Sequence, residues 1–234
     1  MSTAPSRILL KLSGEALKGT DSVFSPESLS RIAGEIAPLS SPEIAIVLGG
    51  GNLIRGARSP WLDRVEADTL GMLATVLNAL ALRNHLEHLG RRVVVQSAVS
   101  TEFTDRVSPR EARQAMRDGC IVLFSGGTGS PLVTTDTAAA LRAIAIEADL
   151  LAKASTVDGV YDGDPATDPN ATRLEELTYD DFLTQRLGVM DQTAIELCRE
   201  HGMPVEVFNF DRPGALAELA AGKRVGTRIG GIRE

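Results

Sequence analysis

The chain has 234 residues, of which 43% are hydrophobic and 24% are charged, and its formal net charge is −7. These values are typical of a globular chain that buries a sizeable core. The negative charge argues against a general nucleic-acid grip, which needs a broad basic surface. A series of base-stacking platforms is also disfavoured, because the chain has 1 Trp, 2 Tyr and 6 Phe. We expect no nucleic-acid partner, but a small anionic ligand held locally remains open.

The predicted elements of the first half alternate between strands and helices. In chain order they are a strand at Arg7–Leu12, a helix at Pro26–Leu39, a strand at Ile44–Leu48, a helix at Asp68–Leu89, a strand at Val93–Gln96, a helix at Ser108–Asp118, a strand at Ile121–Phe124, a helix at Asp136–Glu147 and a strand at Leu150–Ala154. Several of these strands are apolar on both faces. That pattern predicts an α/β fold with a mainly parallel central sheet sandwiched by helices in three layers.

The second half has a different texture. A turn-rich hairpin and loop at Val157–Asn170 precedes helices at Tyr179–Gln185 and Asp191–Glu200, a strand at Val205–Asn209, a helix at Pro213–Leu219 and a strand at Thr227–Ile229. We find no linker between the halves. The sequence therefore predicts a single domain, residues 1–234, with two lobes at about 1–150 and about 151–234.

The cysteines and the chain start indicate the compartment. Cys120 and Cys198 lie far apart beside apolar residues and form no disulfide framework or zinc spacing, so both are interpreted as reduced core thiols. The start is short and polar, and charges interrupt the apolar stretches before membrane-spanning length. We expect a cytoplasmic protein with no membrane partner.

The helix predicted from Asp68 is apolar most of the way round in its first half. One stripe contains Leu70, Leu73, Leu77 and Leu80, and a second contains Met72, Val76 and Ala79. Such a helix is buried on more than one side. It is either a central core helix or one shared with a second subunit, and we expect an oligomer.

Three glycine-rich turns follow predicted strands. They are Lys11–Glu15 (KLSGE), Gly49–Asn52 (GGGN) with Arg55 beyond it, and Ser125–Pro131 (SGGTGSP) leading to Asp136. Glycine lets backbone N–H groups approach a phosphate closely, and Lys or Arg adds charge. Ligands of open α/β sheets bind at the carboxyl ends of the strands. Together the turns predict two phosphate groups held facing each other.

Each turn also has a simpler interpretation. Lys11 is one of four lysines and could extend to solvent from a strand end, the glycines could form plain tight turns, and Asp136 suits a helix N-cap. The aspartates between Lys153 and Pro165 are better explained as turn formers than as a calcium loop. Tyr161 in that loop could pack on a nucleobase.

Other nucleotide and hydrolase motifs are missing from the sequence. GxxxxGK[ST], a spaced GxGxxG with its acidic residue, and GxSxG do not occur. His85, His88 and His201 are not placed like a catalytic base. Phosphoryl transfer fits these features, because it depends on positioning and charge neutralisation more than on covalent catalysis.

The sequence resembles the amino-acid-kinase superfamily and, within it, the bacterial uridylate (UMP) kinases. The resemblance runs from Arg7 to about Thr227. The motifs that carry it are RILLKLSGEAL (Arg7–Leu17), GGGNLIRG (Gly49–Gly56), DTLGMLATVLNALALR (Asp68–Arg83), SGGTGSPLVTTDTAAALRAIAIEAD (Ser125–Asp149), VDGVYDGDP (Val157–Pro165) and VMDQTA (Val189–Ala194).

The resemblance implies Mg²⁺-dependent transfer of the ATP γ-phosphoryl group to UMP, in pyrimidine nucleotide biosynthesis. It implies catalytic roles for Lys11, Arg55, Asp136 and Asp191, with the two aspartates as the carboxylates that order Lys11 and the metal-bound phosphates. ATP contacts are implied for Lys11, Leu12, Ser13, Gly14, Gly51, Arg55, Ser155, Tyr161 and Asp164. UMP contacts are implied for Gly50, Asp68, Thr128, Gly129, Ser130, Pro131, Leu132, Val133, Thr134 and Thr135. No residue is assigned as a direct metal ligand.

The resemblance also implies a homohexamer, a trimer of dimers, which agrees with the apolar helix. GTP activation stays open, because Ser22 and Phe24 depart from the glycine-rich loop of GTP-activated members. UTP inhibition is allowed because UTP can occupy the UMP site. The alternative function is a nucleotide-binding regulatory protein on the same fold without catalysis, against which the joint presence of the four catalytic residues argues.

Overall fold

The computed structural model describes residues 4–54, 61–163, 167–168 and 170–231. Within these residues, a nine-stranded sheet has the order β4-β3-β5-β2-β1-β6-β10-β11-β9. Only the β10–β11 pair among them is antiparallel. The strands are β1 (Arg7–Leu12), β2 (Glu43–Leu48), β3 (Val93–Ser97), β4 (Asp105–Arg106), β5 (Ile121–Ser125), β6 (Leu150–Ser155), β9 (Glu176–Leu177), β10 (Val205–Asn209) and β11 (Thr227–Ile229), with a separate hairpin of β7 (Val160–Tyr161) and β8 (Arg173–Leu174).

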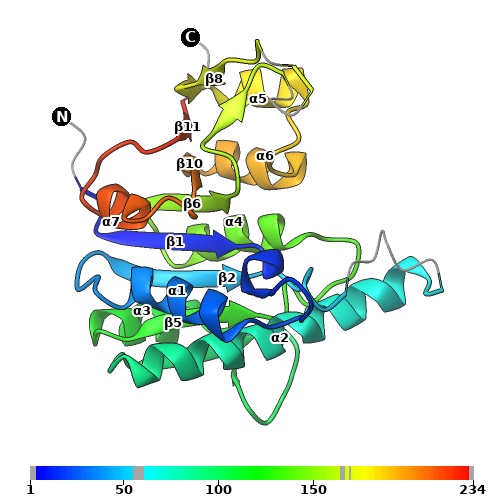
Figure 1. Cartoon of the computed structure of the whole chain (residues 1–234), viewed down its shortest axis with the longest axis vertical. Helices are drawn as coiled ribbons and strands as arrows, with labels where there is room; N and C mark the ends of the chain where they lie inside the picture. Colours follow the sequence, from blue (N-terminus) through cyan, green and yellow to red (C-terminus); the bar gives the residue numbers. More distant parts are fainter. Residues whose placement is uncertain (1–3, 55–60, 164–166, 169, 232–234) are drawn as a thin grey trace.

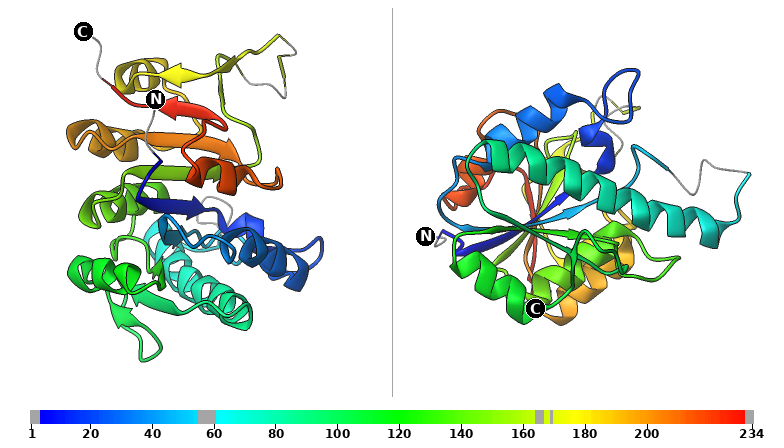
Figure 2. Two further views of the ribbon diagram at one scale, coloured as in Figure 1. Left: turned by 90° about the vertical axis from the view of Figure 1, so that its left-hand side faces the viewer. Right: turned by 90° about the horizontal axis from the view of Figure 1, so that it is seen from below.

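Helices cover both faces of this sheet, as Figure 2 shows when the molecule is seen from below. They are α1 (Pro26–Ile36), α2 (Arg64–His88), α3 (Pro109–Arg117), α4 (Thr135–Ala145), α5 (Tyr179–Gln185), α6 (Gln192–Glu200) and α7 (Ala215–Ala220), with a 3₁₀ turn η1 at Gly14–Leu17. The layers confirm the predicted α/β class and the mainly parallel sheet.

Two cores lie on opposite faces of the sheet, because successive strand residues point to opposite sides. From β1, Ile8 and Leu10 join the core beneath α1, α2 and α7. Leu9 joins the other core, beneath α3, α4 and α6. By the same alternation Lys11 lies on the Leu9 face, at the carboxyl end of β1, where that core gives way to polar groups.

Several predicted boundaries are wrong by a few residues. The helix expected from Asp68 begins at Arg64, because the Asp63 side chain accepts hydrogen bonds from the N–H groups of Val65 and Glu66. The helix expected to reach Leu39 ends at Ile36. The two-residue strands β4 and β9 were not predicted, because so short a segment carries no periodicity. Cys198 is buried as predicted, but Cys120 is only half-buried.

The proposed capping role of Asp136 is also wrong. Thr134 is the N-cap of α4, and its hydroxyl accepts hydrogen bonds from Asp136 N (3.1 Å) and Thr137 N (3.3 Å). Asp136 therefore lies in the first turn of α4, where its side chain is free to serve another purpose.

Helix α2 buries one of its two apolar stripes. Val76 and Ala79 pack in the core, whereas Leu73 and Leu77 are 46% and 51% exposed. By length and mean hydropathy alone α2 would suit a membrane span. Fewer than half of the residues in its most apolar stretch are buried in the fold. The expectation of no such segment considered only uncharged stretches. Because α2 contacts α1, β3 and β5, its apolar character already has a role inside the fold.

Candidate active site

The three glycine-rich turns meet at one edge of the sheet. They follow β1, β2 and β5, which are neighbours in the order β5-β2-β1-β6, so their carboxyl ends lie side by side (Figure 1). The first two turns touch. A Cβ atom on Gly14 would lie 2.7 Å from both Gly49 O and Gly51 N. Only glycine allows the backbones to approach this closely, as the sequence predicts.

Asp136 lies between two lysines at this edge. Its Oδ1 is 2.7 Å from Lys11 Nζ, and its Oδ2 forms an ion pair with Lys153 Nζ. Lys11 and Lys153 are 7% and 8% exposed. Burial by itself would raise the pKa of the Asp136 carboxyl, but the two ammonium groups hold it below its ordinary value. The cluster therefore carries two cations and one anion, a net positive charge poised for a phosphate.

Lys153 is a functional candidate that the sequence reasoning missed. Burial, and then the charge of Lys11, lower the pKa of its ammonium group to about 8. The signal was present in the sequence, since Lys153 stands near the end of an apolar strand as Lys11 does. Their equivalence is fixed by the parallel register, in which Lys11 pairs with Lys153.

The partners of Asp191 are at the start of α4, whereas the carboxylate that contacts Lys11 is Asp136. It is the N-cap of α6, where Oδ1 accepts a hydrogen bond from Ala194 N at 2.7 Å. Thr137 Oγ1 donates to Oδ1 at 3.0 Å, and the Thr134 hydroxyl donates to Oδ2. The carboxylate therefore ties α6 to the threonine-rich entry of α4, beside Asp136.

A pocket of about 520 Å³ lies between α2 and the turns after β2 and β5. Seven of the residues expected to contact UMP or the phosphates line it, namely Gly50, Gly51, Asp68, Ser130, Val133, Thr134 and Thr135. Asp68 Oδ2 accepts hydrogen bonds from Leu132 N and from Arg64 Nε, both at 2.9 Å. Asp68 thus anchors the loop between β5 and α4 to α2. The loop also carries Thr128, Gly129, Pro131 and Leu132, of which Leu132 is largely exposed.

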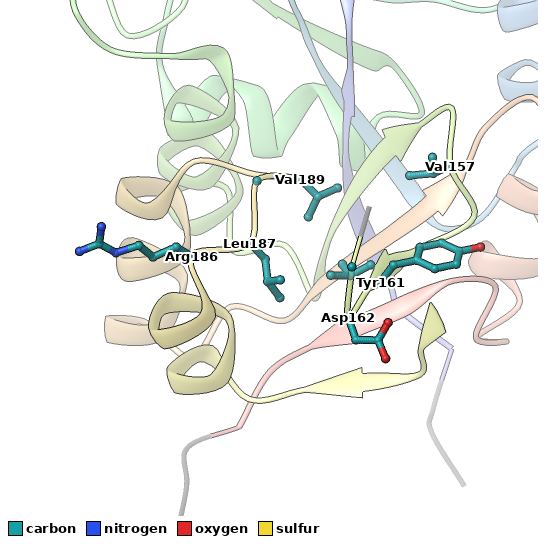
Figure 3. A pocket seen from close by; sticks show the side chains of 10 residues that line it. Val157, Tyr161, Asp162, Arg186, Leu187 and Val189 are labelled. Carbon is teal, nitrogen blue, oxygen red and sulfur yellow. The ribbon is translucent and has the colours of Figure 1, made fainter. Parts of the chain in front are cut away.

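Two further pockets have other linings, and the lysines line the first of them. One, of about 500 Å³, is lined by Lys11, Leu12, Ser13, Lys153 and Ser155 among others. The second, of about 530 Å³, lies between the β7 segment and the loop from Arg186 to Val189. In Figure 3 Tyr161, Val157 and Leu187 line this pocket, whereas the Arg186 side chain extends away from the other labelled ones.

The structure thus brings most of the predicted residues to one edge. Arg55 and Asp164, predicted to contact ATP, lie outside the described residues. Tyr161 Oη donates to Asp158 Oδ1 at 2.6 Å, which fixes the ring at the pocket wall. The described part of the chain contains no cluster of three His, Cys, Asp or Glu side chains able to hold a metal ion.

Comparisons with known proteins define the family. Residues 6–209 match the amino acid kinase family. The chain belongs to this family. It is 51% identical to a uridylate kinase of Stutzerimonas stutzeri over 95% of this chain and 93% of that protein, and 50% identical to one of Pseudomonas aeruginosa over 95% and 94%. The fold superposes on the crystal structure of UMP kinase from Bacillus anthracis with a TM-score of 0.93 and 38% identity, covering 97% of this chain and 96% of that one.

Proposed function

We propose that this protein is a UMP kinase, which transfers the γ-phosphoryl group of ATP to UMP and yields ADP and UDP. The observation that carries the proposal is the Lys11–Asp136–Lys153 cluster. Both lysines line the pocket that we assign to ATP, and Asp136 directly follows Thr134 and Thr135, which line the pocket that we assign to UMP. The uridylate kinase relatives at about 50% identity over nearly the whole chain support the same reaction.

On the acceptor side, Gly50 and Asp68 contact UMP, and the segment Thr128–Thr135 wraps around it with Thr135 near its phosphate. A UMP phosphate oxygen attacks the γ-phosphorus of ATP, and the bond to the β,γ-bridging oxygen breaks. No general base is needed, because a phosphate monoester with a second pKa of about 6 is mostly ionised at pH 7.

On the donor side, Lys11 and the Ser13–Gly14 turn bind the ATP phosphates, with Gly51 and Arg55 adding contacts. Lys153 is a second cation that stabilises the negative charge on the phosphoryl group as it is transferred. Asp136 holds both ammonium groups in place. Ser155, Tyr161 and Asp164 hold the adenosine. In this proposal the acceptor lobe comprises about residues 1–150 and the donor lobe about 151–234.

Mg²⁺ fits this site as an ion that would enter bound to the ATP phosphates. Both site carboxylates are already engaged, Asp136 by lysines and Asp191 by threonines and the α6 N-terminus. Protein-bound Mg²⁺ commonly keeps waters and uses substrate phosphates as ligands, so no protein cage is required. The ion would neutralise charge on the β- and γ-phosphate oxygens.

The exposed stripe of α2 supports association with a second copy of the chain, within a homohexamer built as a trimer of dimers. We place the enzyme in the cytoplasm. GTP as activator and UTP as inhibitor are the regulators to test. Ser22 and Phe24 lie in the segment that decides whether GTP activates the enzyme.

A coupled ADP-release assay with UMP, CMP and dUMP, each with and without GTP or UTP, tests the function. We expect strong preference for UMP. Preference for CMP would reject the assigned acceptor, and nucleotide binding without turnover would favour the non-catalytic alternative.

A further inference from the structure

The side chains of Asn52 and Asn78 form a reciprocal amide pair behind the phosphate-binding turns. Asn78 Nδ2 donates to Asn52 Oδ1 at 2.8 Å, and Asn52 Nδ2 donates to Asn78 Oδ1 at 3.0 Å. Asn78 is 0% exposed although it lies in the middle of the apolar helix α2. A buried amide in such a place is retained only when its hydrogen bonds are satisfied.

The pair also holds the backbone of the glycine turn. Asn78 Nδ2 donates to Gly49 O at 2.7 Å, and this contact is buried. Gly49 N in turn donates to Leu12 O at 2.8 Å, which continues the β1–β2 ladder into the turn. The position of Gly49 is therefore set from both sides, by the sheet and by α2.

The same pair touches the Ser13–Gly14 turn and the segment before α1. A Cβ atom on Gly14 would lie 2.6 Å from Asn52 Oδ1, so the two turns are packed against the amide. Asn52 Nδ2 also donates to Val23 O at 2.8 Å. Two amide groups thus contact three backbone segments. One segment follows β1, the second follows β2, and the third precedes α1.

We propose that Asn78 is a positioning residue for phosphoryl transfer, acting through Asn52 and Gly49 on the backbone N–H groups of Gly50 and Gly51. This inference rests on the proposed function, because those groups matter only if the turn faces phosphates of both substrates. Asn78 lines none of the pockets described above and acts through the turn. Small misplacements of reacting groups are costly, so loss of the pair should affect turnover more than substrate affinity.

The test compares Asn52→Ala, Asn78→Ala and the double variant. We expect each single variant to lower kcat about 10- to 100-fold with a smaller change in either KM. Because the two residues act as one unit, the double variant should be at most about threefold slower than the worse single variant. Losses that multiply, or a change in KM alone, would overturn the proposal.

Leu82→Ala is the matched control for destabilisation. Leu82 lies one turn further along α2, is 0% exposed and belongs to the apolar core. We expect this variant to lose thermal stability while keeping kcat within about threefold of wild type. If Leu82→Ala lowers kcat as much as Asn78→Ala at equal loss of stability, the asparagine has only a structural role.

A second readout does not depend on turnover. Hydrogen exchange of residues 49–54 should accelerate in Asn78→Ala and Asn52→Ala but not in Leu82→Ala, at a temperature where all are folded. Unchanged exchange in the asparagine variants would overturn the positioning role. An inactive wild-type protein would instead reject the UMP kinase function, so the two failures are distinguishable.

Discussion

Lys11 and Lys153 stand opposite each other on the neighbouring parallel strands β1 and β6, and both ammonium groups contact the carboxylate of Asp136. Two like charges so close together repel each other, and the shared carboxylate offsets that repulsion. The pairing keeps one net positive charge at the sheet edge. A polyphosphate that arrives there gains two cations already in position.

Replacing Lys153 with Met removes one of these cations. We expect kcat to fall at least about 100-fold, the size of losing one transition-state charge contact, and Lys11→Ala to do the same. Steady-state assays at saturating UMP and ATP measure this. Lys223→Met, at an exposed lysine after α7, is the control and should keep wild-type turnover. Near-normal kcat in Lys153→Met would remove Lys153 from the chemistry.

The pKa of Lys153, lowered by burial to about 8, predicts an alkaline limit. The free enzyme loses this proton as pH rises through about 8, so kcat/KM for ATP should fall above that pH. Bound phosphates favour the charged ammonium and raise its pKa, so kcat should fall only at higher pH. In Lys153→Arg, which stays charged, the fall in kcat/KM should shift to higher pH. An unshifted limit would assign it to another group.

Asp191→Asn keeps the shape of the side chain but removes its charge. Asparagine is as good an N-cap as aspartate, so α6 should remain stable. We expect a lower kcat with UMP binding largely kept, because the carboxylate accepts from Thr137 beside Asp136. Turnover and equilibrium binding of UMP, measured on the same preparation, separate the two effects. An equal loss of both would place the role of Asp191 elsewhere.

Gly14→Ala should disrupt the contact between the first two turns. The new Cβ would lie 2.6 Å from Asn52 Oδ1 and 2.7 Å from Gly49 O, which is closer than van der Waals contact. We expect a loss of about 1–3 kcal/mol in the free energy of unfolding and a higher KM for ATP. Gly34→Ala in α1 is the matched control, since nothing lies within 4 Å of its Cβ position. It should stabilise the protein by about 0.5–1 kcal/mol. Denaturant titration tells them apart.

Leu77→Glu tests the exposed stripe of α2. A carboxylate at this position would be buried in a subunit contact, so we expect a smaller assembly by light scattering coupled to size exclusion. Leu89→Glu is the control, because Leu89 is 52% exposed against 51% for Leu77 but lies beyond the end of α2. If both variants keep the wild-type mass, the stripe is not an assembly surface.

The sequence by itself determined the fold class and the three turns, because these depend on local pattern. Apolar strands alternating with helices predict a covered parallel sheet, and the glycines of KLSGE, GGGN and SGGTG mark close backbone approaches wherever they fold. Residue pattern alone could not separate a capping role of Asp136 from an ion pair, since the two look alike in one dimension, and only the family resemblance pointed to its contact with Lys11. The helix start at Asp63 was also missed, because Asp63 and Asp68 are the same residue type and either can cap a helix.

The tertiary structure alone decided which charges meet. Lys11 and Lys153 are 142 residues apart and become neighbours only through the strand order β1-β6, which no local pattern encodes. The Asn52–Asn78 pair likewise exists only because α2 packs beside the turn after β2. Residue types and spacing predict what a segment can bind. Strand order and register determine which segments bind it together, because contacts between distant residues depend on how the whole chain packs.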